Sequence, residues 1–271
     1  MTRFAKLFLI SALAGTLGLV GCSDDGGSGG SAGSGGTGGT AGDGGGGNGG
    51  QPPEIAECGE GEEIDDSYTI DAGEVSCHYL VHEDGRIVHM VDEDMRAWHA
   101  GASSWDGRDD VNSRSIGIEI VNPGHGPDYR DFPDAQIEAV IALSRDIISR
   151  HAIQPRHVLA HSDVAPGRKV DPGEKFPWAT LAGHGVGLWV EPEIKSCSLA
   201  IRPGDTGKHV AELQYALAAL GYNIEASGVY DGWTQTVVLS FQMHYRPVCC
   251  DGVADDQTRA VLEALLASHA S

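Results

Sequence analysis

The strongest constraint on this chain is a low-complexity segment near its start. Residues 23–51 consist almost entirely of Gly, Ser, Thr and Ala. Such a segment carries too little apolar surface to offset the conformational entropy that folding costs. It predicts a flexible tether with a root-mean-square reach of about 30 Å, taking ~5–6 Å times the square root of its length. A folded body must lie beyond it, and the remaining residues suffice for one medium and one small domain.

The apolar run before the tether has the pattern of an export signal. Residues 2–6 are basic, and residues 7–20 are apolar but too short and too rich in Gly and Ala for a permanent membrane span. The run ends in Leu-Val-Gly-Cys at Cys22, which resembles the lipobox of bacterial lipoproteins, where the cysteine is lipidated and becomes the N-terminus. The alternative is a plain secretory signal with an unrelated cysteine.

The charge balance bears on the partners of the chain. The formal net charge is -21, with 18 Lys and Arg residues. Phosphate backbones require concentrated basic surface, so this composition argues against a nucleic-acid partner. The acidic excess is otherwise read as a solubility feature.

Six cysteines are present, and five remain if Cys22 carries lipid. Their spacing lacks the paired arms of a zinc ribbon, and an exported chain meets an oxidising setting that favours disulfides. The candidate bridges are Cys58 with Cys77, and Cys197 with either Cys249 or Cys250. One thiol is left over, and the sequence does not say which.

The body opens with strand patterns. Residues 77–82 and 85–91 read as two β-rich runs joined by the hairpin turn Glu83-Asp84-Gly85. A third strand is expected over residues 115–121, with its three isoleucines on one face. Glu119 then lies on the opposite face, beside small residues, and that exposed carboxylate is a candidate general base.

A helix and a loop follow. Asp134 is the expected N-cap of a helix with apolar residues on one side, and residues 157–160 form a short strand that ends at His161. The loop from His161 to Gly173 holds Asp171, and imidazole nitrogen and carboxylate oxygen are both common zinc ligands. In extended chain, Lys169 and Asp171 point to the same side, so the lysine could stabilise an oxyanion beside the metal.

The last part of the chain predicts a small helical module. Val210, Leu213, Leu217 and Leu220 have helical spacing, and Gly221 ends that helix. Residues 228–234 (GVYDGWT) are then echoed by residues 252–258 (GVADDQT), each read as a turn followed by a helix. Three short helices are too small for an active site of their own, so we interpret this part as a binding module.

Four motifs resemble one enzyme family. They are Val75–Leu80 (VSCHYL), Arg96–Gly101 (RAWHAG), Asn112–Glu119 (NSRSIGIE) and the loop His161–Gly173. In this order they are similar to the zinc-dependent N-acetylmuramoyl-L-alanine amidases, type 2. Residues 198–267 resemble the three-helix peptidoglycan-binding module, through Pro203–Gly207, Leu213-Gln214 and Phe241-Gln242.

The resemblance implies both a fold and a division of the chain. The expected fold is an α/β amidase domain, with a mixed central sheet flanked by helices, plus a small three-helix peptidoglycan-binding domain. The expected parts are a lipoprotein signal peptide (1–22), a disordered Gly/Ser-rich linker (23–53), the amidase domain (54–196) and the peptidoglycan-binding domain (197–271).

The resemblance also implies roles for individual residues. His161 and Asp171 are then Zn²⁺ ligands, Glu119 is the general base and Lys169 stabilises the oxyanion. Trp98 and Asn112 are expected to shape the groove for sugar and peptide, although packing and turn formation would explain them equally well. His78 and His99 are expected to hold the sheet and loops rather than bind metal.

One ligand of the family is missing from its usual place. The family carries its first zinc histidine in a pattern like apolar-apolar-His-Tyr-Thr, at the end of an earlier strand. Here residues 64–69 (IDDSYT) place Ser67 at that position. Catalytic zinc normally keeps three protein ligands plus water, so Asp66, His78 or His82 would have to substitute.

The predicted function is hydrolysis of the amide between N-acetylmuramic acid and L-alanine in peptidoglycan or muropeptides. The predicted location is the cell envelope, with a lipid anchor in the outer membrane and the body facing the periplasm. The first alternative is a catalytically impaired relative that binds peptidoglycan without cutting it. The second is a surface lipoprotein that anchors the envelope through its C-terminal module alone.

Overall fold

The computed structural model describes residues 7–13, 76–193 and 200–269. The strands are β1 Leu7–Leu13, β2 Tyr79–Val81, β3 Ile87–His89, β4 Ser104–Trp105, β5 Arg108–Asp109, β6 Ser115–Val121 and β7 Val158–Ala160. The α-helices are α1 Asp134–His151, α2 His161–Val164, α3 Trp178–Gly183, α4 Lys208–Leu220, α5 Gly232–Tyr245 and α6 Asp256–His269; two 3-10 helices are η2 Val111–Arg114 and η3 Pro155–His157.

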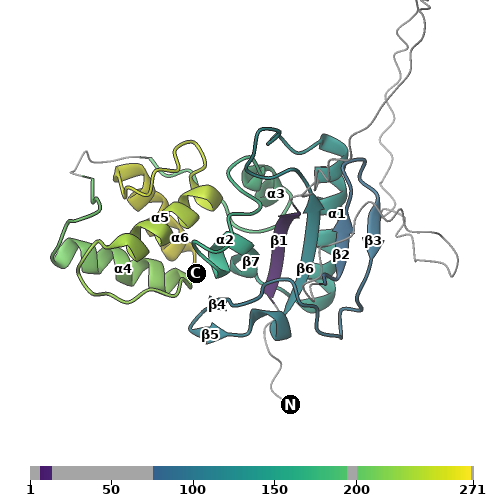
Figure 1. Cartoon of the computed structure of the whole chain (residues 1–271), viewed down its shortest axis with the longest axis horizontal. Helices are drawn as coiled ribbons and strands as arrows, with labels where there is room; N and C mark the ends of the chain where they lie inside the picture. The colour runs from purple at the N-terminus through teal and green to yellow at the C-terminus, as the bar shows by residue number, and fades with distance from the viewer. Residues whose placement is uncertain (1–6, 14–75, 194–199, 270–271) are drawn as a thin grey trace, which may run out of the picture. The chain divides into compact units, whose positions relative to one another are not determined.

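A five-stranded mixed sheet organises the first module. Its order is β3-β2-β6-β1-β7, and only β3 runs antiparallel to its neighbour. Figure 1 shows this sheet with α1 packed along one side. The predicted mixed sheet flanked by helices is therefore confirmed, and the predicted hairpin appears as β2 and β3 with Gly85 at a φ of 87° in the turn.

Strand β6 divides the core from the site. Ile116, Ile118 and Ile120 are buried in one apolar cluster with Val140 and Ile147 of α1. Burying an isoleucine side chain contributes roughly 1.5–3 kcal/mol, so this face fixes the register of the strand. The opposite face of β6 carries Ser115, Gly117 and Glu119, as the alternation predicts.

Helix α1 begins one residue differently from the prediction. Asp134 is the first helical residue, Pro133 occupies the cap position, and no side chain caps the helix. Asp134 still lies in the first turn, where a carboxylate is stabilised by the helix dipole. The helix ends at Ala152, which adopts a left-handed backbone with a φ of 52°.

Strand β1 occupies the centre of the sheet. It pairs in parallel with β6 on one side and with β7 on the other. Its residues belong to the run in which an export signal is predicted. Among the described helices, none is long and apolar enough to cross a bilayer.

The C-terminal module contains the three predicted helices and the predicted repeat. Helix α4 ends before Gly221, which has a φ of 132°. The amide of Gln214 donates to Val229 O and to Thr234 Oγ1, and the amide of Gln242 donates in the same way to Val253 O and Thr258 Oγ1. Both copies use one buried glutamine to tie a turn to the start of the following helix.

Candidate active site

The structure brings His161 and Asp171 together. Strand β7 ends at Ala160, so His161 begins α2 at the edge of the sheet, and the Ser162 N–H donates to the Asp171 carbonyl over 3.1 Å. Nδ1 of His161 then lies 2.7 Å from Oδ2 of Asp171, and their side chains are 1% and 16% exposed. A nitrogen and a carboxylate oxygen at this distance need a proton or a cation between them.

Charge around Asp171 favours its ionised form. Burial alone would raise the pKa of this carboxyl, but the hydrogen bond with His161 and the charges of His161 and Lys169 outweigh it, and the pKa is lowered. Lys169 is half-buried, and its N–H donates to the Ala165 carbonyl over 3.0 Å. The charge of Lys169 therefore helps to keep the Asp171 carboxylate ionised.

Glu119 lies on the same face of the sheet as this pair. It is two residues from Gly117 along β6, so the two positions share a face. A Cβ built on Gly117 would lie 2.5 Å from Cγ of His99, which shows that the His99 ring covers this face. His99 in turn contacts His161, with 3.4 Å between Nδ1 and Nε2. Glu119, His99 and His161 thus line one side of the sheet.

The pairing register of the strands shows where Glu119 lies along the strand direction relative to His161. Glu119 pairs with Ser11 of β1, and Ile10 of β1 pairs with Ala160, the residue before His161. Glu119 and His161 therefore lie level with each other, two strand spacings or about 10 Å apart at the backbone. The backbone position between them on β1 is that of Ser11.

The candidates for a substitute ligand are placed as follows. The His78 Nδ1 accepts from the Gly117 N–H over 2.9 Å, and its Nε2 faces the Met95 carbonyl at 3.3 Å. Both ring nitrogens are thus used to tie β2 to β6 and to a loop, as predicted for His78. His82 follows β2 at the end of the strand, and Asp66 and Ser67 lie outside the described residues. No cluster of three His, Cys, Asp or Glu side chains suited to a metal occurs within residues 76–193 and 200–269.

The predicted groove residues differ in exposure. Trp98 is 51% exposed, and the Arg96 guanidinium carbon lies 3.9 Å from its ring centroid. Asn112 is buried, and its Oδ1 accepts from the N–H groups of His99 and Ala100 over 3.1 and 2.8 Å. The position of Trp98 suits a wall for a ligand, whereas the contacts of Asn112 hold the loop that carries His99.

Sequence reasoning gave too little weight to two residues. His99 was expected only to hold the loop, yet it contacts His161 directly, and burial together with the nearby His161, His78 and Lys169 lowers its pKa well below the ordinary value. Asp163 is fully buried in α2 and accepts from the Ala160 N–H over 2.8 Å. The contacts of His99 with His161 and of Asp163 with Tyr222 join residues 62 and 59 positions apart, so no local pattern could identify them.

Comparison with known proteins agrees with this geometry. A model of the N-acetylmuramoyl-L-alanine amidase family matches residues 48–174, and a model described as a putative peptidoglycan binding domain matches residues 206–262. The N-acetylmuramoyl-L-alanine amidase AmiD of Escherichia coli is 40% identical over 213 residues, covering 74% of this chain and 77% of AmiD. The chain belongs to the N-acetylmuramoyl-L-alanine amidase family.

Solved structures support this family assignment over both modules. A complex of AmiD from E. coli with the substrate anhydro-N-acetylmuramic acid-L-Ala-D-gamma-Glu-L-Lys matches with a TM-score of 0.66 and 38% identity, covering 76% of this chain and 84% of that one. AmpDh3 from Pseudomonas aeruginosa matches with a TM-score of 0.61 and 32% identity, over 73% and 84%. The predicted family and fold are confirmed.

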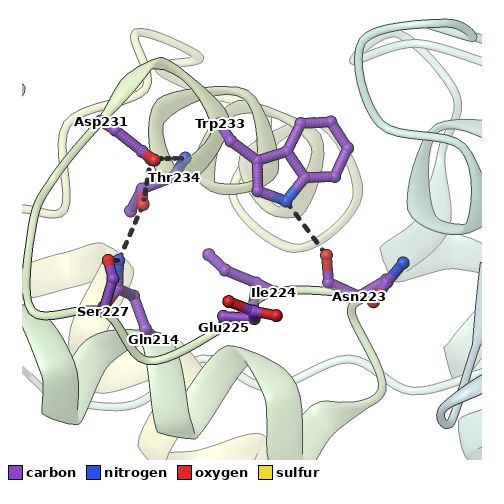
Figure 2. A pocket seen from close by; sticks show the side chains of 8 residues that line it. All are labelled: Gln214, Asn223, Ile224, Glu225, Ser227, Asp231, Trp233 and Thr234. Carbon is purple, nitrogen blue, oxygen red and sulfur yellow. Dashed lines mark hydrogen bonds between the residues drawn. The ribbon is translucent and has the colours of Figure 1, made fainter.

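The amidase-family chain also has a pocket in its C-terminal module. The pocket encloses about 290 Å³ and is lined in part by Asn223, Glu225, Asp231 and Trp233 (Figure 2). The indole N–H of Trp233 donates to the Asn223 carbonyl over 3.0 Å, and the residue is 43% exposed. One aromatic side chain is thus fixed at the pocket with much of its surface accessible, an arrangement suited to binding a ligand.

Proposed function

We propose that this chain hydrolyses the amide between the lactyl group of N-acetylmuramic acid and the L-alanine of the stem peptide. The observation that carries the proposal is the buried pair of His161 and Asp171, level with Glu119 on one face of the sheet. The chain belongs to a family whose relative AmiD has been solved with an anhydromuramyl peptide substrate. The substrate class is therefore peptidoglycan or the muropeptides derived from it.

The donor atoms of the pair fit a zinc ion. His161 and Asp171 offer a nitrogen and a carboxylate oxygen in a largely buried place, and both are favoured zinc ligands. Their 2.7 Å separation is that of a hydrogen bond, and zinc binding would widen it to roughly 3.3 Å. Zinc bound there would polarise the scissile carbonyl and lower the pKa of its water. No group of three such side chains suited to a metal occurs among the described residues, and Asp66 and Ser67 lie outside them.

Glu119 and Lys169 supply the proton transfer and the charge stabilisation. Glu119 takes a proton from the attacking water as the oxygen bonds to the carbonyl carbon, and returns it to the leaving nitrogen as the carbon–nitrogen bond breaks. Lys169, whose charge acts on Asp171, stabilises the negative oxygen of the tetrahedral intermediate. The products are a free lactyl carboxylate and a peptide with a free amino terminus.

The test is to measure bound zinc and peptide release on one purified sample of the full chain. Zinc at one ion per chain and release of peptide from muropeptides are expected. Glu119→Gln should reduce the rate by about 100-fold or more, because general acid–base catalysis contributes 10²–10⁴-fold, with zinc content unchanged. Full activity of Glu119→Gln would refute the assigned role of this residue.

A second candidate function is binding of peptidoglycan without cleavage. The observation that favours it is Ser67, which stands where the family carries its first zinc histidine. Under this alternative the purified chain would bind sacculi but hold no stoichiometric zinc and release no peptide. The measurement described above separates the two functions.

The proposal also covers the membrane anchor of the protein and the bounds of its two domains. We propose that Cys22 is lipidated and becomes the N-terminus, which would tether the body to the outer membrane through residues 23–53. The amidase domain would then span residues 54–196 and the peptidoglycan-binding domain residues 197–271. Mass spectrometry of the protein from bacterial membranes should find an acylated Cys22, and a mature chain that retains residues 1–21 would refute this placement.

A further inference from the structure

The ring of His99 is held in one place by a glycine and an asparagine. It lies against Gly117, where a Cβ would come within 2.5 Å of Cγ and leave no room for the ring. Asn112 accepts from the backbone N–H groups of His99 and Ala100, which fixes the loop that carries the ring. The His99 residue is 5% exposed, so its two nitrogens must find partners within the protein.

A carbonyl oxygen at one end sets the direction of the hydrogen bonds through His99. The Ser115 hydroxyl donates to the Val111 carbonyl over 2.6 Å, and a carbonyl can only accept. Ser115 Oγ is therefore an acceptor for Nε2 of His99, which lies 3.2 Å away. With its proton on Nε2, neutral His99 has a lone pair on Nδ1.

That lone pair faces His161. Nδ1 of His99 lies 3.4 Å from Nε2 of His161, the two rings are within 13° of parallel, and their centroids are 5.7 Å apart. The centroid distance exceeds the nitrogen distance by about two imidazole radii, so the two rings meet edge to edge, nearly in line. His161 can therefore donate an Nε2 proton to His99, which leaves its Nδ1 available to a cation held together with Oδ2 of Asp171.

We propose that His99 is the positioning residue of the metal site, because it accepts the Nε2 proton of His161 and so selects the tautomer that presents Nδ1 to a metal shared with Asp171. This inference rests on the proposed function, since it assumes that the pair holds zinc. Outer-shell partners of this kind orient a histidine ligand, and their loss typically costs 10–100-fold in metal affinity. Ser115 completes the arrangement, because it fixes the tautomer of His99 in turn.

The test compares zinc dissociation constants measured by chelator competition on the full chain. His99→Leu fills the space without an acceptor and should raise the dissociation constant by about 10–100-fold. His99→Asn places an amide oxygen near the former Nδ1 position and should restore much of the affinity. Ser115→Ala keeps the His99 ring and should weaken zinc by a smaller factor than His99→Leu, whereas Ser115→Thr, which retains a hydroxyl, should match the wild type.

A buried histidine elsewhere provides the control. His157 is 5% exposed and lies at the other end of β7 from His161, where its Nε2 is 3.3 Å from Oδ2 of Asp106. His157→Asn should leave zinc affinity unchanged even if it lowers stability. In the zinc-loaded wild type, the Nε2 proton of His161 should give a slowly exchanging proton resonance that His99→Leu loses.

The outcomes separate this inference from the proposed function. Unchanged zinc affinity in both His99→Leu and Ser115→Ala would overturn the positioning role while leaving the amidase assignment intact. Equal losses in His99→Leu and His99→Asn would also overturn it, because only packing would then be at stake. A wild-type chain that binds no zinc would overturn the zinc site and this inference together.

Discussion

Nδ1 of His244 lies 2.6 Å from Oδ2 of Asp163, and both side chains are fully buried. Asp163 is in α2, two residues after His161, whereas His244 is in α5 of the C-terminal module. The Tyr222 hydroxyl donates to the other oxygen of Asp163 over 2.5 Å, and Trp178 stacks on His244 with 3.8 Å between centroids. The helix that begins with the candidate zinc ligand is therefore anchored in the peptidoglycan-binding module.

Asp163→Ala should destabilise the protein strongly. The substitution leaves His244 and Tyr222 buried without their acceptor and removes the bond to the Ala160 N–H. Breaking a buried pair by removing one partner costs about 3–5 kcal/mol. Urea unfolding followed by circular dichroism would measure this loss.

An exposed ion pair gives the control for Asp163. Lys208 and Glu212 lie 2.5 Å apart on α4, with side chains 88% and 60% exposed. Lys208→Ala should leave the free energy of unfolding almost unchanged, because exposed pairs contribute little. If Asp163→Ala is as stable as Lys208→Ala, the buried contact between the modules does not exist in solution.

The charge network around Glu93 predicts how stability depends on pH. Burial alone would raise the pKa of Glu93, but hydrogen bonds from Arg150, His151 and Tyr79 outweigh it and lower the pKa to about 2 from 4.5. A depressed carboxyl pKa stabilises the fold above the unfolded value and loses that contribution as pH falls toward the folded value. Stability should therefore fall between about pH 4.5 and pH 2, by at most about 3 kcal/mol from this group.

Glu93→Gln tests that assignment. The amide cannot titrate, so the variant should be less stable than the wild type at pH 7, and the difference should shrink as the pH is lowered toward 2. Denaturant midpoints measured across this range would show the convergence. A constant difference at every pH would mean that the Glu93 charge contributes nothing to stability.

Gly117→Ala should displace the His99 ring and lower stability, although it removes no functional side chain. The added Cβ would lie 2.5 Å from Cγ of His99, within a buried contact that cannot open freely. Overpacking of this kind costs about 1–3 kcal/mol, and it should also displace the ring from His161. Gly183→Ala is the matched control, because nothing lies within 4 Å of a Cβ there and the residue is helical, so it should be neutral or stabilising. Equal stability of the two variants, measured by thermal unfolding, would contradict this account.

Local sequence patterns predicted the helices and strands of this fold better than the contacts between distant residues. The alternation of residues 115–121 predicted β6 with the same bounds, and the loop from His161 to Gly173 brings its two predicted ligands together. Helices α5 and α6 run farther than predicted, because Asp231 caps the first of them and polar residues extend both beyond the apolar core. The contacts of His99 with His161 depend on distant segments meeting, which no periodicity encodes.

The repeat in the C-terminal module supplies a matched pair of variants. Trp233 lines the pocket of the first copy, and Gln257 stands at the same position of the second copy. Trp233→Ala should weaken binding to isolated sacculi severalfold, because a fixed aromatic side chain is a common anchor for ligands. Gln257→Ala should bind as the wild type does in a pull-down assay. Equal binding of sacculi by both variants would mean that peptidoglycan contacts another part of the module.

Deletion of residues 1–21 should loosen the centre of the sheet. Strand β1 pairs with both β6 and β7, so a chain that begins at residue 22 lacks the strand between them. Unpaired backbone groups in a buried position cost about 1–3 kcal/mol each, and backbone amides of β6 and β7 should exchange with deuterium faster in that shorter chain than in the full chain. Peptides from α5 and α6 serve as the internal control, because neither helix pairs with β1. Equal protection of β6 in both chains would show that residues 7–13 do not hold the sheet in solution and that the Ser11 position belongs to another segment.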